Sequence, residues 1–169
     1  MADSKSYLKD KYILVVDDEE DILETIEEML ESSRVEVAKD YESASKKLKT
    51  NKYDLAILDI MGVNGMQLLE EAVKMNIPAV MLTAHAMNTE SLMESIRKGA
   101  MSYIPKDSLA DIETLLGDLL KASDEGNPPW KLLFDMVGPA FNRKFGAHWK
   151  EADKAFWADF EKTNQNDKD

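Results

Sequence analysis

Five short apolar runs separated by helical patterns constrain the fold of this chain more than any other feature of its sequence. The runs cover residues 12–16, 35–38, 55–58, 79–82 and 101–104. After each run, apolar residues recur at the three- and four-residue spacing of one helix face. Because the runs are continuously apolar, both faces of each strand must be covered, which requires a parallel sheet with helices on either side. The pattern therefore predicts an α/β fold with a doubly wound, five-stranded parallel sheet.

The aromatic residues divide the chain into two parts. All five Tyr lie at or before Tyr103, whereas all five Phe and all three Trp lie at or after Trp130. The polar stretch 122–129 contains the Gly and Pro residues that end helices and form linkers. We therefore expect four parts: a sheet domain at 10–122, a linker at 123–129, an α-helical extension at 130–162 and a disordered tail at 163–169.

Charge and composition exclude several classes of protein. The chain carries 21 Lys and Arg residues against 33 Asp and Glu residues, a net charge of −12 that opposes binding to phosphate backbones and anionic lipid. The absence of Cys excludes disulfides, thiolate zinc sites and cysteine nucleophiles. The N-terminus has no apolar core of signal-peptide length, and no apolar run could span a bilayer. We expect a cytoplasmic protein with neither nucleic acid nor membrane as its partner.

Polar side chains gather where the predicted strands end. Asp17 and Asp18 follow the first strand, Asp59 the third and Thr83 the fourth, and Lys106 comes just beyond the fifth. Each has a structural explanation when taken alone: the acids open or cap helices, the threonine makes a turn and the lysine is solvated. Parallel sheets of this kind bind ligands at the carboxyl ends of their central strands. The whole set therefore indicates a functional site at this edge.

The residue types in this set suit phosphoryl transfer. Carboxylates that repel one another need a cation, and an oxygen-only cluster favours Mg²⁺. An ammonium and a hydroxyl beside the metal can bind the oxygens of a phosphoryl group as it transfers. An aspartate can be the nucleophile and form an acyl phosphate. The small Ala84 after Thr83 leaves the Asp59 carboxylate accessible to a phosphoryl donor.

Four motifs mark residues 10–121: Val-Val-Asp-Asp-Glu at 15–19, Leu-Asp-Ile-Met at 58–61, Thr-Ala at 83–84 and Tyr-x-x-Lys at 103–106. With these motifs, this part of the chain resembles the receiver domain of bacterial two-component response regulators. The separations also suit that family, with 41 residues from Asp18 to Asp59, 24 from there to Thr83 and 23 more to Lys106. The resemblance implies a flavodoxin-like strand order, 2-1-3-4-5, and membership of a phosphorelay.

The resemblance also implies the role of each acid. Asp59 would accept a phosphoryl group from the phosphohistidine of a sensor histidine kinase or a phosphotransfer protein. Asp18, Asp59 and the backbone carbonyl of Met61 would bind Mg²⁺ directly, and Asp17 would act through water. The chain would then be no enzyme beyond its own Mg²⁺-dependent phosphorylation and dephosphorylation.

Three further residues would read the phosphorylated state. The resemblance implies that Thr83 and Lys106 contact the phosphoryl oxygens, that Thr83 moves toward the phosphate and that Tyr103 turns inward. The surface formed by the fourth helix, fifth strand and fifth helix would change as a result, and the signal would pass through altered protein–protein interaction.

The chain departs from the family in two places. The family's lysine is usually followed by a proline, whereas here Pro105 precedes Lys106 and Asp107 follows it. After Asp59, the loop Ile-Met-Gly-Val-Asn-Gly is shorter than usual. His85 lies two residues beyond Thr83, where the family tunes the loss of the phosphoryl group, but we interpret a lone histidine there as a surface residue.

The last part of the chain needs a surface to cover it. Apolar and aromatic residues recur at helical spacing in 132–145 and 149–160, with Pro139 starting or kinking a helix. A segment of this size cannot bury its eight Phe and Trp residues alone. Packing on the domain's own helices, a homodimer interface and a docking surface for a downstream protein all stay open. No helix-turn-helix reader is recognisable here.

Three other functions remain as alternatives to a phosphoacceptor. The altered loops are consistent with an interaction module that is never phosphorylated. A phosphohydrolase with an aspartate nucleophile would normally carry a second carboxylate two residues later, where this chain has Met61. A flavin-binding module would carry a Ser/Thr/Gly-rich phosphate loop after the first strand, where this chain has the acidic run 17–20.

Overall fold

The computed structural model describes residues 4–84 and 89–126, which form a five-stranded parallel sheet covered on both faces. The strands are β1 (Tyr12–Val16), β2 (Arg34–Ala38), β3 (Leu55–Asp59), β4 (Ala79–Thr83) and β5 (Ser102–Pro105). They pair in the order β2-β1-β3-β4-β5. The predicted fold class and strand order are therefore confirmed for the sheet domain. The expected extension at 130–162, the tail at 163–169, the linker residues 127–129 and His85 lie outside the described residues.

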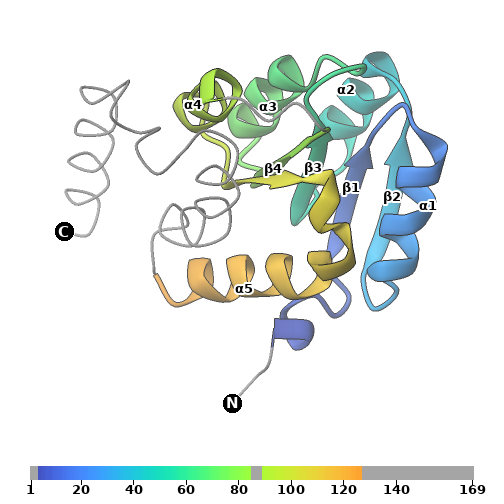
Figure 1. Ribbon diagram of the computed structural model, residues 1–169, viewed down its shortest axis with the longest axis vertical. Helices are drawn as coiled ribbons and strands as arrows, with labels where there is room; N and C mark the ends of the chain where they lie inside the picture. Colours follow the sequence, from blue (N-terminus) through green and yellow to red (C-terminus); the bar gives the residue numbers. More distant parts are fainter. Residues whose placement is uncertain (1–3, 85–88, 127–169) are drawn as a thin grey trace.

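Helices cover the sheet on two sides (Figure 1). The α-helices are α1 (Glu20–Met29), α2 (Tyr41–Thr50), α3 (Gly65–Lys74), α4 (Thr89–Arg97) and α5 (Ile112–Asp124), with 3₁₀ helices η1 (Ser4–Tyr7) and η2 (Lys106–Asp111). Apolar side chains of α1 and α5 pack on one face of the sheet, and those of α2, α3 and α4 pack on the other. Within this part of the chain, no helix combines the length and the apolar character that crossing a membrane requires.

The continuous apolar runs result from this double cover. Every residue of β3 and β4 is buried, as are four of the five residues of β1. Successive side chains point to opposite faces. Ile13 and Val15 pack in the core beneath α1 and α5, while Leu14 and Val16 pack in the core beneath α2, α3 and α4. A strand with only one buried face would have alternated with polar residues.

The segment after β5 differs from the simple helical pattern. Leu109 shares the apolar spacing of the last helix, but it lies in η2, and α5 begins only at Ile112. Its side chain is 7% exposed and packs in the same core as α5. The spacing therefore identified the buried face correctly, although a tighter turn precedes the α-helix.

A carboxylate clamp joins α2 to α3. The hydroxyls of Tyr41 and Ser45 donate to Glu71 Oε2 and Oε1 at 2.7 and 2.6 Å, and Lys49 Nζ lies 3.6 Å from Oε1. Burial opposes ionisation, but the two hydroxyls and the lysine together lower the pKa of Glu71. The ionised carboxylate is thus held by two charge-assisted hydrogen bonds.

We expect Ser45→Ala to lower the free energy of unfolding by about 1 to 2 kcal/mol, because Ser45 is buried and donates to a charged acceptor. Lys49→Met is the matched control. The Lys49 side chain is 64% exposed, so losing its ion pair with Glu71 is expected to change stability by less than about 0.5 kcal/mol. Urea unfolding at neutral pH measures both values, and equal losses would contradict the assigned strength of the hydroxyl contact.

Candidate functional site

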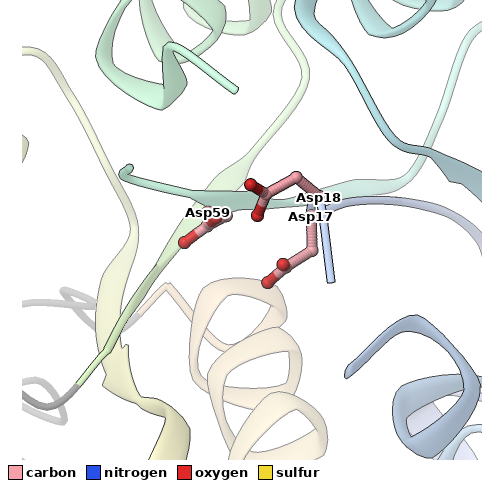
Figure 2. A group of neighbouring side chains, drawn as sticks. All are labelled: Asp17, Asp18 and Asp59. Atoms are coloured by element: carbon pink, nitrogen blue, oxygen red, sulfur yellow. The ribbon is translucent and has the colours of Figure 1, made fainter. Parts of the chain in front are cut away.

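Three aspartates converge at the carboxyl edge of the sheet (Figure 2). Asp17 and Asp18 come directly after β1, and Asp59 is the last residue of β3. Because β1 and β3 are parallel neighbours with Val16 opposite Leu58, the residues that follow this pair lie side by side. One carboxylate oxygen from each aspartate lies within 4.8 Å of the others. The structure thus brings together the three acids that the sequence singled out.

Burial differs among the three carboxylates. Asp17 is 0% exposed and Asp59 is 3% exposed, whereas Asp18 is exposed to solvent. Asp17 Oδ1 accepts a hydrogen bond from the Glu19 amide at 2.8 Å, so Asp17 also stabilises the turn into α1. Asp17 therefore both stabilises this turn and belongs to the acid cluster.

Lys106 is the residue directly after β5, and its side chain contacts this acid cluster. Its Nζ lies 2.9 Å from Asp17 Oδ2, 3.3 Å from Asp59 Oδ1 and 3.6 Å from Glu19 Oε2, and its side chain is 11% exposed. Pro105 ends β5 directly before it, and in residues 4–84 and 89–126 no peptide bond is cis. The lysine thus enters the pocket without the proline that usually follows it in the receiver family.

The carboxylates of the acid cluster carry more negative charge than Lys106 neutralises, and the pKa values of the cluster are shifted accordingly. Burial and the neighbouring charge of Asp17 raise the pKa of Asp59 to about 6, with Lys106 acting in the opposite direction and Asp18 adding to the rise. Burial also raises the pKa of Asp17, against the contacts with Lys106 and the Glu19 amide. For Lys106, contacts with Asp17 and Asp59 outweigh burial and raise its pKa. One ammonium therefore does not balance three carboxylates.

The donor set fits a hard divalent cation. All ligand atoms in the cluster are carboxylate oxygens, which Mg²⁺ prefers. Asp17 Oδ2 is buried, and in the described part of the chain its partner is Lys106 Nζ, 2.9 Å away. The three carboxylate oxygens lie close enough together to share one such ion.

Thr83 lies on β4, the strand beside that of Asp59, and Tyr103 lies on β5, one strand further out. Thr83 ends β4 and is 6% exposed, and its neighbour Leu82 pairs with Asp59. Tyr103 lies on β5 opposite Met81 and is 1% exposed, so its ring is inside the domain in this structure. Its hydroxyl lies 2.7 Å from the Ser91 hydroxyl, which links β5 to α4.

The loop between β3 and α3 completes the rim of the site. Met61 is 73% exposed, two residues beyond Asp59. Gly62 follows with a φ of +84°, and a Cβ added there would lie within 3 Å of the Asp18 carboxylate. Sequence reasoning gave no role to Gly62, to the contact of Glu19 with Lys106 or to Ser91. Only Gly62 had a visible signal, as a glycine in the shortened loop.

Known proteins share this architecture. Residues 13–117 match the response regulator receiver domain family, which is more than half of the chain. The chain belongs to this family. The family resemblance drawn from the four motifs is thereby confirmed, and the domain is a receiver of the kind found in two-component systems.

Individual relatives agree with this assignment. The chain matches the alkaline phosphatase synthesis transcriptional regulatory protein PhoP of Bacillus subtilis with 34% identity over 125 residues, which covers 70% of this chain and 52% of that protein. It matches the two-component response regulator ARR18 of Arabidopsis thaliana with 36% identity over 100 residues, which covers 56% of this chain and 16% of that protein. The chain thus spans about half or less of these relatives.

Among solved structures, the receiver domain of the Francisella response regulator 1452 superposes with a TM-score of 0.60 at 29% sequence identity. The match covers 67% of this chain and 98% of that domain. A receiver domain protein from Methanospirillum hungatei gives a TM-score of 0.55 at 30% identity, again over nearly all of its length. The match therefore spans whole receiver domains and leaves about a third of this chain outside it.

Proposed function

We propose that this receiver takes a phosphoryl group onto Asp59 from the phosphohistidine of a histidine kinase or phosphotransfer protein, in a Mg²⁺-dependent reaction, and signals by changing its protein interactions. One observation supports this above all others. The nearly buried Asp59 carboxylate lies beside Asp17, Asp18 and Lys106, at the edge of the sheet where such folds bind ligands.

In the transfer step, one Asp59 carboxylate oxygen attacks the phosphorus of the donor. An O–P bond forms while the N–P bond to the imidazole breaks, and its electron pair leaves on the imidazole nitrogen. Since its pKa is about 6, Asp59 is mostly ionised and nucleophilic at neutral pH. Lys106 Nζ, 3.3 Å from Asp59 Oδ1, would hold the carboxylate and then pair with the phosphoryl oxygens, joined by the Thr83 hydroxyl.

The metal site would use this chain's acids in distinct ways. Asp18, Asp59 and the Met61 carbonyl would bind Mg²⁺ directly, and Asp17 would accept a hydrogen bond from a metal-bound water. When bound, Mg²⁺ supplies the positive charge that the carboxylates and the incoming phosphoryl group both need. The three acids otherwise repel a dianion.

Hydrolysis would reset the receiver. A water oxygen attacks the phosphorus, the O–P bond to Asp59 breaks, and inorganic phosphate leaves. These steps act on the chain's own aspartate, so the receiver is not an enzyme for an external substrate. The exposed, apolar Met61 stands where a phosphohydrolase with an aspartate nucleophile would carry its second carboxylate, which favours the receiver over that alternative.

The test is phosphorylation of the full chain by acetyl phosphate. We expect intact-mass measurement to show one added phosphoryl group on the wild-type chain with Mg²⁺, and none with EDTA or in Asp59→Asn. A modified Asp59→Asn would place the acceptor elsewhere. An unmodified wild-type chain would instead favour the interaction module that is never phosphorylated.

A further inference from the structure

The loop that contains Gly62 passes unusually close to Asp18. Only residues 60–64 separate the end of β3 from the start of α3, so the chain must turn directly over the acid cluster. At Gly62, φ is +84°, a conformation that side chains rarely adopt. A Cβ at this position would lie 2.6 Å from Asp18 Oδ2, 2.8 Å from Cγ and 2.9 Å from Oδ1.

We propose that Gly62 is a positioning residue for the metal site. Its missing side chain leaves the space in which the Asp18 carboxylate faces Asp59. Any larger residue would compete with that carboxylate for the same volume. This inference rests on the proposed function, because it assigns Gly62 to the metal binding that the transfer requires.

A Cβ at residue 62 would displace the Asp18 side chain without disrupting the fold. Asp18 is exposed, and its carboxylate ends a short side chain that can rotate into solvent. A Cβ at residue 62 would therefore be accommodated by moving a metal ligand out of the pocket. Removing or misplacing one ligand weakens metal binding much more than it weakens the core.

Gly65, three residues later, shows the opposite case. A Cβ there would collide with the backbone carbonyl oxygen of Asp59, at the end of the buried strand β3. No side-chain rotation can relieve a collision with backbone. Gly65 is therefore required by the fold, whereas Gly62 is required by the site.

The experiment compares Mn²⁺ binding by the full-length wild type, Gly62→Ala and Gly126→Ala, with free Mn²⁺ measured by electron paramagnetic resonance. Gly126 is the matched control: its φ is +79°, but nothing in the described part of the chain lies within 4 Å of an added Cβ. We expect Gly62→Ala to bind Mn²⁺ about tenfold or more weakly than wild type. Gly126→Ala should bind like wild type, and both variants should lose a similar amount in urea midpoint.

The other possible results contradict either the positioning role of Gly62 or the proposed function itself. If wild type binds Mn²⁺ and Gly62→Ala binds within about twofold of it, the positioning role is wrong while the proposed function stands. If Gly62→Ala does not fold, the collision is borne by the backbone, and the inference is also wrong. If wild type itself does not bind Mn²⁺, the proposed function fails together with the inference that rests on it.

Discussion

Replacing Asp59 with Asn is expected to raise the free energy of unfolding of the metal-free protein by about 2 to 3 kcal/mol at neutral pH. Burial and the charge of Asp17 raise the pKa of Asp59 from 3.8 to about 6, in spite of Lys106. The folded state thus holds the ionised carboxylate less favourably than the unfolded chain does. Asn has nearly the same shape without the charge, so it removes this penalty.

The sign of the effect sets its pH dependence. In the unfolded chain Asp59 ionises near pH 3.8, whereas in the folded protein it keeps its proton to about pH 6. The contribution of Asp59 to stability is therefore fully present below the lower value and is lost as the pH rises through about 6. The difference between wild type and Asp59→Asn should be small near pH 4 and reach its full size by about pH 7.

Urea unfolding in EDTA across this pH range measures the difference. Asp21→Asn is the control, because Asp21 is an exposed acid in the first turn of α1 and its replacement should change stability by no more than about 0.5 kcal/mol. Added Mg²⁺ should narrow the gap by stabilising wild type more than the variant. A variant no more stable than wild type at neutral pH would show that Asp59 is not under electrostatic strain.

The sheet could be predicted from the sequence because each buried strand forms a short, continuously apolar run of residues. A strand such as β3, buried on both faces, must be continuously apolar, and helices on both sides must each carry an apolar stripe. The site could be predicted at the level of the strand edge for the same reason. Parallel strands all end at one edge, so Asp17, Asp59 and Thr83 had to lie near one another.

Contacts that depend on loop paths could not be predicted in this way. The register of β1 and β3 places Asp17 near Asp59, but nothing in the spacing shows that Gly62 passes over Asp18. The same holds for Lys106, whose reach to Asp17 depends on the turn into η2 and on its rotamer. Periodicity describes elements, whereas ligand geometry is decided by the few residues between them.

We expect Lys106→Met to lower the free energy of unfolding of the metal-free protein by about 3 kcal/mol at neutral pH, because it removes one partner from a buried ion pair. Lys106 Nζ lies 2.9 Å from Asp17, which is 0% exposed, and 3.3 Å from Asp59. Met keeps the apolar stem, so the loss reports charge more than packing. Without the ammonium, these two nearly buried carboxylates repel each other.

Lys98→Met is the matched control for this change. Lys98 also contacts two carboxylates, Glu70 at 2.8 Å and Glu94 at 3.9 Å, but those side chains are 50% and 51% exposed. Solvent screens such pairs, so we expect a loss below about 1 kcal/mol in the same urea titration. Equal losses for the two lysines would contradict the burial argument.

A double variant separates the electrostatic cause from a local packing defect. If Lys106 acts by compensating buried charge, then adding Asp59→Asn to Lys106→Met removes one of the two carboxylates left without a partner. Asp59→Asn should therefore stabilise the Lys106→Met protein more than it stabilises wild type, by about 1 kcal/mol or more. Strict additivity would mean that Lys106 holds the turn into η2 by packing, and that its charge is not what the acid cluster requires in the absence of metal.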